Sequence, residues 1–262
     1  MAAQMIPGAV PADRLRGVLF YINERESAKV DELAAHFAVS AATVRRDLDE
    51  LARQGLVQRT HGGALTLRPQ SAAERAFGEK LSLQQEEKIR IAAAAAREVR
   101  EGDTVLLDSG TTAYQLALRL AEKKNLTIVT HDLYLAANIE FDASTTVVVT
   151  GGVKRASQNV LVGGMVEQFL STLRGDVAFL TADAVSAVFG VSNANFFEAG
   201  IKRALVRAAK RVVLIADHTK TGKNAVVQVC GLDAVDLFIT DDGLPGRERA
   251  ALAEKGVRLE LV

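Results

Sequence analysis

The residues best suited to hold a charged ligand lie in one short turn, Asp108-Ser109-Gly110-Thr111-Thr112. This turn follows the apolar run Thr104–Leu107 and precedes the helical pattern Ala113–Ala121. The first N–H groups of a helix lack internal partners and the helix dipole makes that end positive, so an anion is stabilised there. The turn alone fits a phosphate cradle, and it equally fits an ordinary strand-to-helix turn in which Ser and Thr cap the helix.

The turn belongs to a regular pattern that begins near Gln84, in which helical stretches alternate with short apolar runs. This pattern predicts a doubly wound, mostly parallel sheet with helices on both faces. The expected strands are Thr104–Leu107, Leu126–Thr130, Thr146–Thr150, Val177–Leu180, Val212–Ala216, Leu237–Thr240 and Val257–Leu261. The expected helices are Glu86–Val99, Ala113–Ala121, Leu133–Ile139, Met165–Leu173, Phe197–Ala209 and Gly246–Lys255.

Ligands of such sheets bind outside the carboxyl ends of the strands, where this chain places glycines, hydroxyls, carboxylates and cations. Cations would attract a phosphate, and carboxylates would accept hydrogen bonds from sugar hydroxyls. The candidate set is the turn Asp108, Ser109, Gly110, Thr111 and Thr112 together with Thr130, Gly151, Gly152, Arg155, Asp183, Glu198, Lys202, Asp217 and Lys220. Such a set suits a phosphorylated polyol.

Most of these residues also have a purely structural interpretation. Asp108, Asp132 and Asp217 could cap helices or turns, and Gly151-Gly152 could form only a turn. Glu198 and Lys202 lie four positions apart on one helix, so they could face the same crevice or simply pair. Lys202 with Arg203 could also be a solvated helical face. Within the turn, anionic Asp108 would repel phosphate, so we expect it to meet a hydroxyl or to hold the loop.

The first 68 residues carry a different pattern of three short helices and two strands. Helices are expected over Asp13–Asn23, Lys29–Phe37 and Ala41–Gln54, with Ser40 as the N-cap of the third. Strands are expected over Gly55–Arg59 and Ala64–Leu67, joined by a turn at His61-Gly62-Gly63. A helix-turn-helix followed by a two-stranded wing is a winged DNA-binding domain.

The outward side of the third helix has the side chains that a recognition helix needs in the major groove. Arginine can bind guanine edges through two hydrogen bonds, and threonine can meet a base edge or a phosphate. The expected DNA contacts are Lys29, Ser40, Ala41, Thr43, Arg45, Arg46, Arg59 and His61. Alternatively, Arg45 and Arg46 pair with Asp49 and Glu50 on a solvated face. No cluster of metal-binding residue types surrounds His61, so we expect no metal.

Motifs in both segments carry a resemblance to a known family. In the first segment they are Arg14, Val18, Ile22, Ser40–Leu48, Gly55–Val57 and His61–Ala64. In the second they are Lys88–Ala92, Gly102–Thr104, Asp108–Thr112, Gly151-Gly152, Glu198-Ala199, Lys202-Arg203, and Asp217 with Lys220. With these motifs the chain resembles the DeoR family of bacterial transcriptional regulators. It departs from the family pattern at His131, where Asn is common, and at Ala182-Asp183-Ala184 and Ala187–Phe189.

The resemblance implies a C-terminal sensor similar in fold to ribose-5-phosphate isomerase and glucosamine-6-phosphate deaminase. In the family this sensor commonly binds a phosphorylated sugar or a related metabolite, which changes the affinity for operator DNA. The departures concern the identity of the ligand rather than the existence of a site.

Composition and charge further restrict the classes of protein to which the chain could belong. No apolar run approaches the roughly 20 residues that a membrane helix needs, and Met1–Val10 lacks the layout of a signal peptide. The single Cys230 excludes a disulfide framework and fits a reducing cytoplasm. Because the net charge is zero, only the local placement of charge can indicate a nucleic-acid partner. No cofactor is expected.

The sequence therefore predicts a winged helix-turn-helix domain over 1–68, a linker over 69–83 that is partly helical around 72–77, and a ligand-sensing α/β domain over 84–262. We expect a cytoplasmic regulator of carbohydrate metabolism, by default a repressor, whose affinity for a double-stranded DNA operator changes when a phosphorylated sugar or polyol binds. A homo-oligomer is expected because one winged domain covers a short site.

Two alternatives remain open at this point. One is a sugar-phosphate isomerase or deaminase with a DNA-binding appendage, in which Asp108, Asp183, Glu198 and Lys202 supply acid and base groups. A shared fold does not imply shared chemistry, which weighs against this alternative. The other is a DNA-binding protein whose second domain only forms oligomers.

Overall fold

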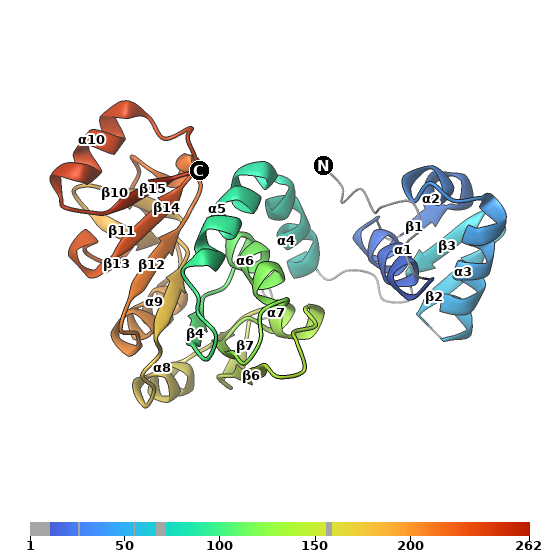
Figure 1. Ribbon diagram of the computed structural model, residues 1–262, viewed down its shortest axis with the longest axis horizontal. Coiled ribbons are helices and arrows are strands. Elements are labelled where there is room, and N and C mark those ends of the chain that lie inside the picture. Colours follow the sequence, from blue (N-terminus) through green and yellow to red (C-terminus); the bar gives the residue numbers. More distant parts are fainter. Residues whose placement is uncertain (1–10, 26, 55, 67–71, 156–158) are drawn as a thin grey trace. The chain divides into compact units, whose positions relative to one another are not determined.

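A computed structural model describes residues 11–25, 27–54, 56–66, 72–155 and 159–262 of the chain. The chain divides into two compact units, Met1–Glu79 and Lys80–Val262 (Figure 1). Of the predicted linker, residues 69–71 lie outside the described residues, as do Gly55 and Leu67 of the predicted wing strands. The remainder of the linker is occupied by the helix α4 (Ala72–Ser82). In the described part of the chain, no helix is long and apolar enough to cross a membrane.

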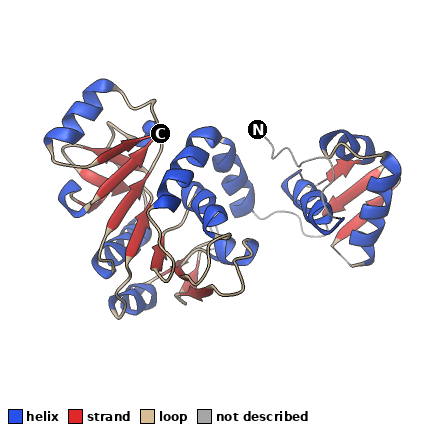
Figure 2. Cartoon of the chain, viewed as in Figure 1, coloured by secondary structure: helices blue, strands red, loops and turns tan. Residues whose placement is uncertain are grey.

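Up to Thr66, the described residues of the N-terminal unit form three helices and a small antiparallel sheet (Figure 2). The helices are α1 (Pro11–Arg25), α2 (Val30–His36) and α3 (Ala41–Arg53), and the strands are β1 (Ser27–Lys29), β2 (Val57–Thr60) and β3 (Gly63–Thr66). The strands lie in the order β1-β3-β2. The first strand was not predicted. It makes the wing three-stranded and holds β3 so closely that a Cβ at Gly63 would lie 2.0 Å from the Ala28 carbonyl oxygen.

The core of this unit holds α3 in a fixed position. Val44, Leu48 and Leu51 are buried, as their spacing predicts, and they pack with Val18 and Leu33. A nearly buried ion pair adds to this packing: the Arg14 guanidinium donates from Nε to Asp47 Oδ2 at 2.7 Å and from Nη2 to Oδ1 at 3.0 Å. The bidentate bond to Asp47 raises the pKa of Arg14. Helix α3 is therefore tied to α1 through both apolar and charged contacts.

The C-terminal unit confirms the predicted doubly wound sheet. Seven parallel strands lie in the order β15-β14-β12-β9-β4-β5-β6. They are β4 (Thr104–Leu107), β5 (Thr127–Thr130), β6 (Thr146–Val149), β9 (Val177–Leu180), β12 (Val212–Ile215), β14 (Leu237–Thr240) and β15 (Leu259–Leu261). The helices are α5 (Gln85–Arg97), α6 (Thr111–Leu120), α7 (Leu133–Asn138), α8 (Gly164–Ser171), α9 (Phe196–Ala208) and α10 (Gly246–Glu254).

Both faces of this sheet are covered, because successive residues of β9, β12 and β14 point to opposite faces and all are buried. Leu106 and Ala178 pack with residues of α8 and α9, among them Leu170 and Leu205. Helix α5 packs against α6, β12 and β14. Burial on both faces explains why these strands are continuous apolar runs in the sequence.

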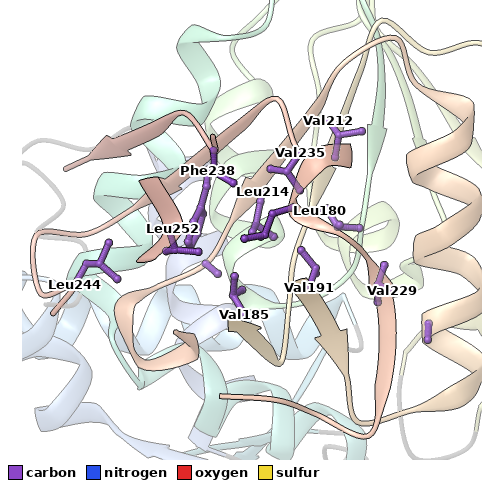
Figure 3. Packing of buried hydrophobic residues seen from close by; sticks show 14 residues of the cluster. Leu180, Val185, Val191, Val212, Leu214, Val229, Val235, Phe238, Leu244 and Leu252 are labelled. Carbon is purple, nitrogen blue, oxygen red and sulfur yellow. The ribbon is translucent and has the colours of Figure 1, made fainter. Parts of the chain in front are cut away.

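A second, three-stranded antiparallel sheet was not predicted. It consists of β10 (Ala184–Ser186), β11 (Gly190–Asn193) and β13 (Val227–Cys230) in the order β10-β11-β13. Its apolar residues extend the core, where Val185, Val191 and Val229 pack with Leu180 and Phe238 of the large sheet (Figure 3). A short pair, β7 (Val153–Lys154) with β8 (Leu161–Val162), follows β6.

The order of the large sheet reverses between β4 and β9. The chain adds β5 and β6 on one side of β4, then returns to place β9, β12, β14 and β15 on the other side. At such a switch point the connections leave in opposite directions and open a crevice at the carboxyl ends of the two strands. The turn 108–112 after β4 and the residues 181–183 after β9 therefore lie at the position where this fold accepts ligands.

Candidate functional site

The turn at the end of β4 leads directly into α6. Gly110 is the N-cap of that helix and has φ 107° and ψ 173°, a backbone conformation that L residues rarely adopt. Ser109 and Thr112 are buried, whereas Gly110 and Thr111 are partly exposed. The exposed part of the turn thus presents a glycine, a hydroxyl and the free end of a helix.

Asp108 lies beneath this turn and is completely buried. Its Oδ2 accepts hydrogen bonds from the backbone N of Thr181 at 2.9 Å and from Thr181 Oγ1 at 2.8 Å, and it forms an ion pair with the Lys202 ammonium. Burial by itself would raise the pKa of Asp108, but Lys202, His131 and the Thr181 N–H together outweigh that effect and hold the pKa below its usual range. The Asp108 carboxylate therefore holds the loop, one of the two roles expected of it.

All three N–H groups of Lys202 have partners inside the protein. Besides Asp108, the ammonium donates to the Thr181 carbonyl oxygen at 3.1 Å and to Thr181 Oγ1 at 2.9 Å. The same Thr181 hydroxyl lies 2.9 Å from the Ser109 carbonyl oxygen. Thr181 was missed by the sequence analysis, although it directly follows β9 and the strand-end rule could have found it. It joins β4, β9 and α9 at the switch point.

His131 and Asp132 close the other side of the turn. His131 Nε2 lies 3.9 Å from Asp108 Oδ1, and burial lowers the pKa of His131 to about 4, so the imidazole is neutral at pH 7. Asp132 caps α7 by accepting from Tyr134 N at 2.9 Å and Leu135 N at 3.0 Å, and its Oδ2 accepts from Gly110 N at 3.3 Å. An N–H group of the turn thus already has a carboxylate partner.

Asp132 should make stability depend on pH. Burial raises the pKa of Asp132 to about 6. A carboxyl whose folded pKa is raised stabilises the fold below its unfolded pKa and loses that contribution as pH rises through the folded value. We expect wild-type protein to lose on the order of 3 kcal/mol relative to Asp132→Asn between pH 4 and pH 7. Urea unfolding of both proteins across this range measures the difference, and parallel pH profiles would contradict the assignment.

A second group of side chains surrounds Glu198, one helical turn before Lys202 on α9. Glu198 Oε1 lies 3.4 Å from Arg155 Nη1, and Oε2 accepts from Asn193 Nδ2 at 3.2 Å. The alternative in which Glu198 pairs with Lys202 is therefore not what the structure shows. Asp183 is exposed and accepts from Ala194 N at 2.9 Å, at the open end of the small sheet. Asn193 was missed because its strand was missed.

The remaining candidates follow other strands, and Thr130 pairs with Leu107 directly beside the turn 108–112. Thr130 Oγ1 accepts from Asp132 N at 3.1 Å, and Gly151 and Gly152, both at positive φ, form the turn after β6. Asp217 caps the short helix η1 (His218–Lys220) and accepts from Thr219 N at 3.0 Å. Asp217 and Lys220 thus follow β12, which is separated from β4 by β9.

A histidine and a carboxylate also meet at this end of the sheet, where the sequence analysis placed neither. His218 Nδ1 lies 2.6 Å from Asp241 Oδ2, and the His218 backbone N donates to Asp241 Oδ1 at 2.7 Å. Asp241 directly follows β14 and is buried. Residues that immediately follow strands are again the signal that could have found this pair. In the described ranges, no group of three His, Cys, Asp or Glu side chains could hold a metal ion.

The outward side of α3 carries two arginines, Arg45 and Arg46, for which the described residues of the N-terminal unit provide no acidic partner. Asp49 pairs with Arg59 at 2.8 Å and Glu50 with Arg53 at 2.6 Å, so the alternative pairing with Arg45 and Arg46 does not occur. Across the described part of the unit, neither arginine forms an ion pair, and both are exposed. Lys29 and His61 are exposed as well, and Ala41 and Thr43 are partly exposed.

Ser40 caps α3, and a pair of substitutions separates that role from a contact with DNA. Its Oγ accepts from Thr43 N at 3.1 Å. We expect Ser40→Ala to lower the free energy of unfolding by about 1 kcal/mol, whereas Ser40→Gly should cost only a few tenths. Thermal unfolding measures this difference. Equal losses would show that the cap contributes nothing, and a DNA-binding defect in Ser40→Gly would reveal a direct contact.

Comparisons with known proteins cover both units. Residues 14–70 match the model described as the DeoR-like helix-turn-helix domain, and residues 83–242 match the DeoR C terminal sensor domain. The HTH-type transcriptional regulator GlpR of Haloferax volcanii is 34% identical over 248 residues, which cover 95% of this chain and 96% of that protein. The glycerol-3-phosphate regulon repressor of Escherichia coli K12 is 32% identical over 248 residues, covering 95% and 98%.

A third relative is the transcriptional repressor AccR of Agrobacterium fabrum, which is 31% identical over 232 residues and covers 88% of this chain and 90% of its own length. Among solved structures, ribose 5-phosphate isomerase A of Methanocaldococcus jannaschii matches with a TM-score of 0.38 and 16% identity, over 53% of this chain and 55% of that one.

Proposed function

The chain belongs to the DeoR family of transcriptional regulators, and from that premise we propose that a phosphorylated polyol or sugar binds at the turn 108–112 and changes operator affinity. The protein is a DNA-binding regulator with an effector-sensing domain, and its relatives are regulators rather than enzymes. We take the regulator to be a repressor that acts as a homo-oligomer, and its DNA-binding and sensing domains to be residues 1–68 and 84–262.

The observation that carries the proposal is the pairing of Asp108 with Lys202 beneath the turn. An unpaired carboxylate at this position would repel a phosphate, but the buried ammonium cancels its charge. The hydroxyls of Ser109, Thr111 and Thr112 and the N-terminus of α6, apart from the Gly110 N–H that Asp132 already accepts, each favour an anion. Lys202 has no free N–H group, so its part in this proposal is to neutralise Asp108.

The surrounding residues suit the remainder of a polyol. Glu198 and Asp183 have carboxylate oxygens that could accept hydrogen bonds from hydroxyl groups, and Arg155 and Lys220 supply positive charge at the same edge of the sheet. Because one relative is named for glycerol 3-phosphate, that compound is the first probe for this chain. Couplings between effector and operator sites are typically about 1–3 kcal/mol, which changes operator occupancy severalfold or more.

A ligand screen on the full-length protein tests this proposal. Glycerol 3-phosphate and other phosphorylated polyols and sugars are added in turn, with inorganic phosphate and glycerol as controls, while thermal unfolding is followed. A true effector at 100 times its dissociation constant should stabilise the protein by about 2.7 kcal/mol. We expect Thr111→Ala and Lys220→Ala to weaken binding about tenfold each, which is the loss of one charge-assisted hydrogen bond. Unchanged affinity in both variants would remove the turn from the site.

A further inference from the structure

The junction between α4 and α5 is a strained bend. Its residue Gln84 has φ 50° and ψ 42°, the left-handed conformation that is unfavourable for residues with a Cβ. Helix α5 begins at the next residue. A residue with a Cβ keeps this backbone conformation only where neighbouring contacts hold it.

Lys88 supplies those contacts. It lies in the first turn of α5 with only 5% of its surface exposed, and its ammonium donates to the carbonyl oxygens of Lys80 and Leu83, both at 2.5 Å. Lys80 belongs to the last turn of α4, so one side chain ties together the end of α4, the bend and the start of α5. Among the described residues this ammonium forms no ion pair, and its third N–H group has no hydrogen-bond acceptor.

Helix α5 runs so that its start lies toward the carboxyl ends of β12 and β14. Arg90 in its first half donates to Asp242, after β14, at 3.2 Å, whereas Glu98 at its other end pairs with Arg211, just before β12. Burial lowers the pKa of Lys88, the Asp217 carboxylate opposes that shift, and the Lys220 ammonium adds to it. Asp217 and Lys220 both belong to the segment that follows β12. The Lys88 ammonium thus lies in the field of the charged groups that follow β12, as well as of Glu87 and Lys80.

The position of α4 in the chain gives this contact its significance. The boundary between the two compact units lies inside this helix, between Glu79 and Lys80. Helix α4 is therefore the described element through which the chain passes from one unit to the other.

We infer that Lys88 is a positioning residue that relays an anion bound near Lys220 to α4, and this inference rests on the function proposed above. An anion at the end of β12 competes with the Lys80 and Leu83 carbonyls for the ammonium. When the ammonium turns toward the anion, the hydrogen bonds across the bend weaken and the strain at Gln84 is released. The junction thus has two hydrogen-bonded arrangements, and the ligand favours one of them.

The test compares full-length wild type with Lys88→Met, and with Lys123→Met as a matched control. Lys123 also donates to a backbone carbonyl near the end of α5, that of Val99 at 2.7 Å, but away from β12. Glycerol 3-phosphate is the probe, and the DNA is selected from a random pool by the wild-type protein. Three quantities are measured: the dissociation constant for the probe, the dissociation constant for the DNA with and without probe, and amide hydrogen exchange over residues 80–88.

In wild type and Lys123→Met, we expect the probe to change DNA affinity about tenfold. In Lys88→Met the bonds to Lys80 and Leu83 are absent with or without probe. DNA affinity without probe should therefore already lie within about threefold of the value for probe-bound wild type, and adding probe should change it less than about twofold, while the probe still binds. Exchange over 80–88 without probe should be about tenfold faster in Lys88→Met only. An undiminished response in a well-folded Lys88→Met protein would overturn the inference.

Two further measurements distinguish a folding defect from loss of the relay, and failure of the proposed function from failure of the relay. Should Lys88→Met fail to fold, Lys88→Arg retains the charge and the donors and should keep at least half of the response; complete loss there would contradict a relay by charge. Should wild type respond to no phosphorylated compound, the proposed function fails. Amide hydrogen exchange over residues 80–88 then tests only whether Lys88 holds the junction between α4 and α5. Equal exchange rates in Lys88→Met and wild type would show that it does not.

Discussion

Replacing Lys202 with methionine is expected to lower the free energy of unfolding by about 3–5 kcal/mol, because it leaves the Asp108 carboxylate buried without its counter-charge. Methionine keeps the volume and apolar length of the side chain, so the loss comes from the charge rather than from a cavity. The Thr181 N–H and hydroxyl remain as donors and limit the loss. Urea unfolding of the full-length variant at pH 7.5 measures it.

The pH dependence of this loss identifies its cause. In wild type the depressed pKa of Asp108 contributes stability above its unfolded pKa, and this contribution is lost as pH falls through the folded value. Without Lys202, burial raises that pKa instead, so the penalty should shrink as the pH is lowered. Lys210→Met is the control, because Lys210 pairs with Asp176 at the surface and should change little. A penalty of equal size at pH 5 and pH 7.5 would point to packing.

Arg45→Ala is expected to weaken binding to selected operator DNA by about 1–3 kcal/mol, the usual discrimination of one arginine that reads a base edge. Arg45 lies exposed in the first half of α3 and has no acidic partner among the residues that the structure describes, so removing it should not disturb the fold. Fluorescence anisotropy with operator and random DNA at one fixed salt concentration measures the effect, because phosphate contacts depend strongly on salt.

The same titration distinguishes base reading from phosphate binding. If Arg45 reads a base, the loss appears on operator DNA and hardly on random DNA. An equal loss on both would assign Arg45 to a phosphate. Arg53→Ala is the matched control, since Arg53 lies in the last turn of the same helix, paired with Glu50. It should bind operator like wild type.

The large sheet could be predicted from the sequence because its strands are buried on both faces. Thr104–Leu107, Val177–Leu180 and Leu237–Thr240 begin and end in the structure at the predicted residues. The strands β10, β11 and β13 could not be found in this way, since they are three or four residues long and combine small and polar residues with apolar ones. β1 is strand only because it pairs with β3.

The candidate site, like the fold, could be predicted from the sequence only in part. Residues that follow a strand could be assigned to one edge of the sheet, because parallel strands place all their carboxyl ends there. The partners of those residues could not be read from the pattern. Asp108 and Lys202 are 94 positions apart, and no local signal indicates that they pair. Lys88 was part of a family motif, but its bonds to Lys80 and Leu83 depend on a bend that the sequence does not indicate.

The reversal of strand order between β4 and β9 has a consequence for synthesis of the protein. A chain is made from its N-terminus, so β4, β5 and β6 leave the ribosome while β9 and α9 are still to come. During that interval the Asp108 carboxylate has neither Thr181 nor Lys202, and the central strand β4 has one unpaired edge. We therefore expect the nascent half-domain to stay open until α9 emerges. Ribosome-bound chains that end before Phe196 should be cut by protease at sites that the finished domain protects.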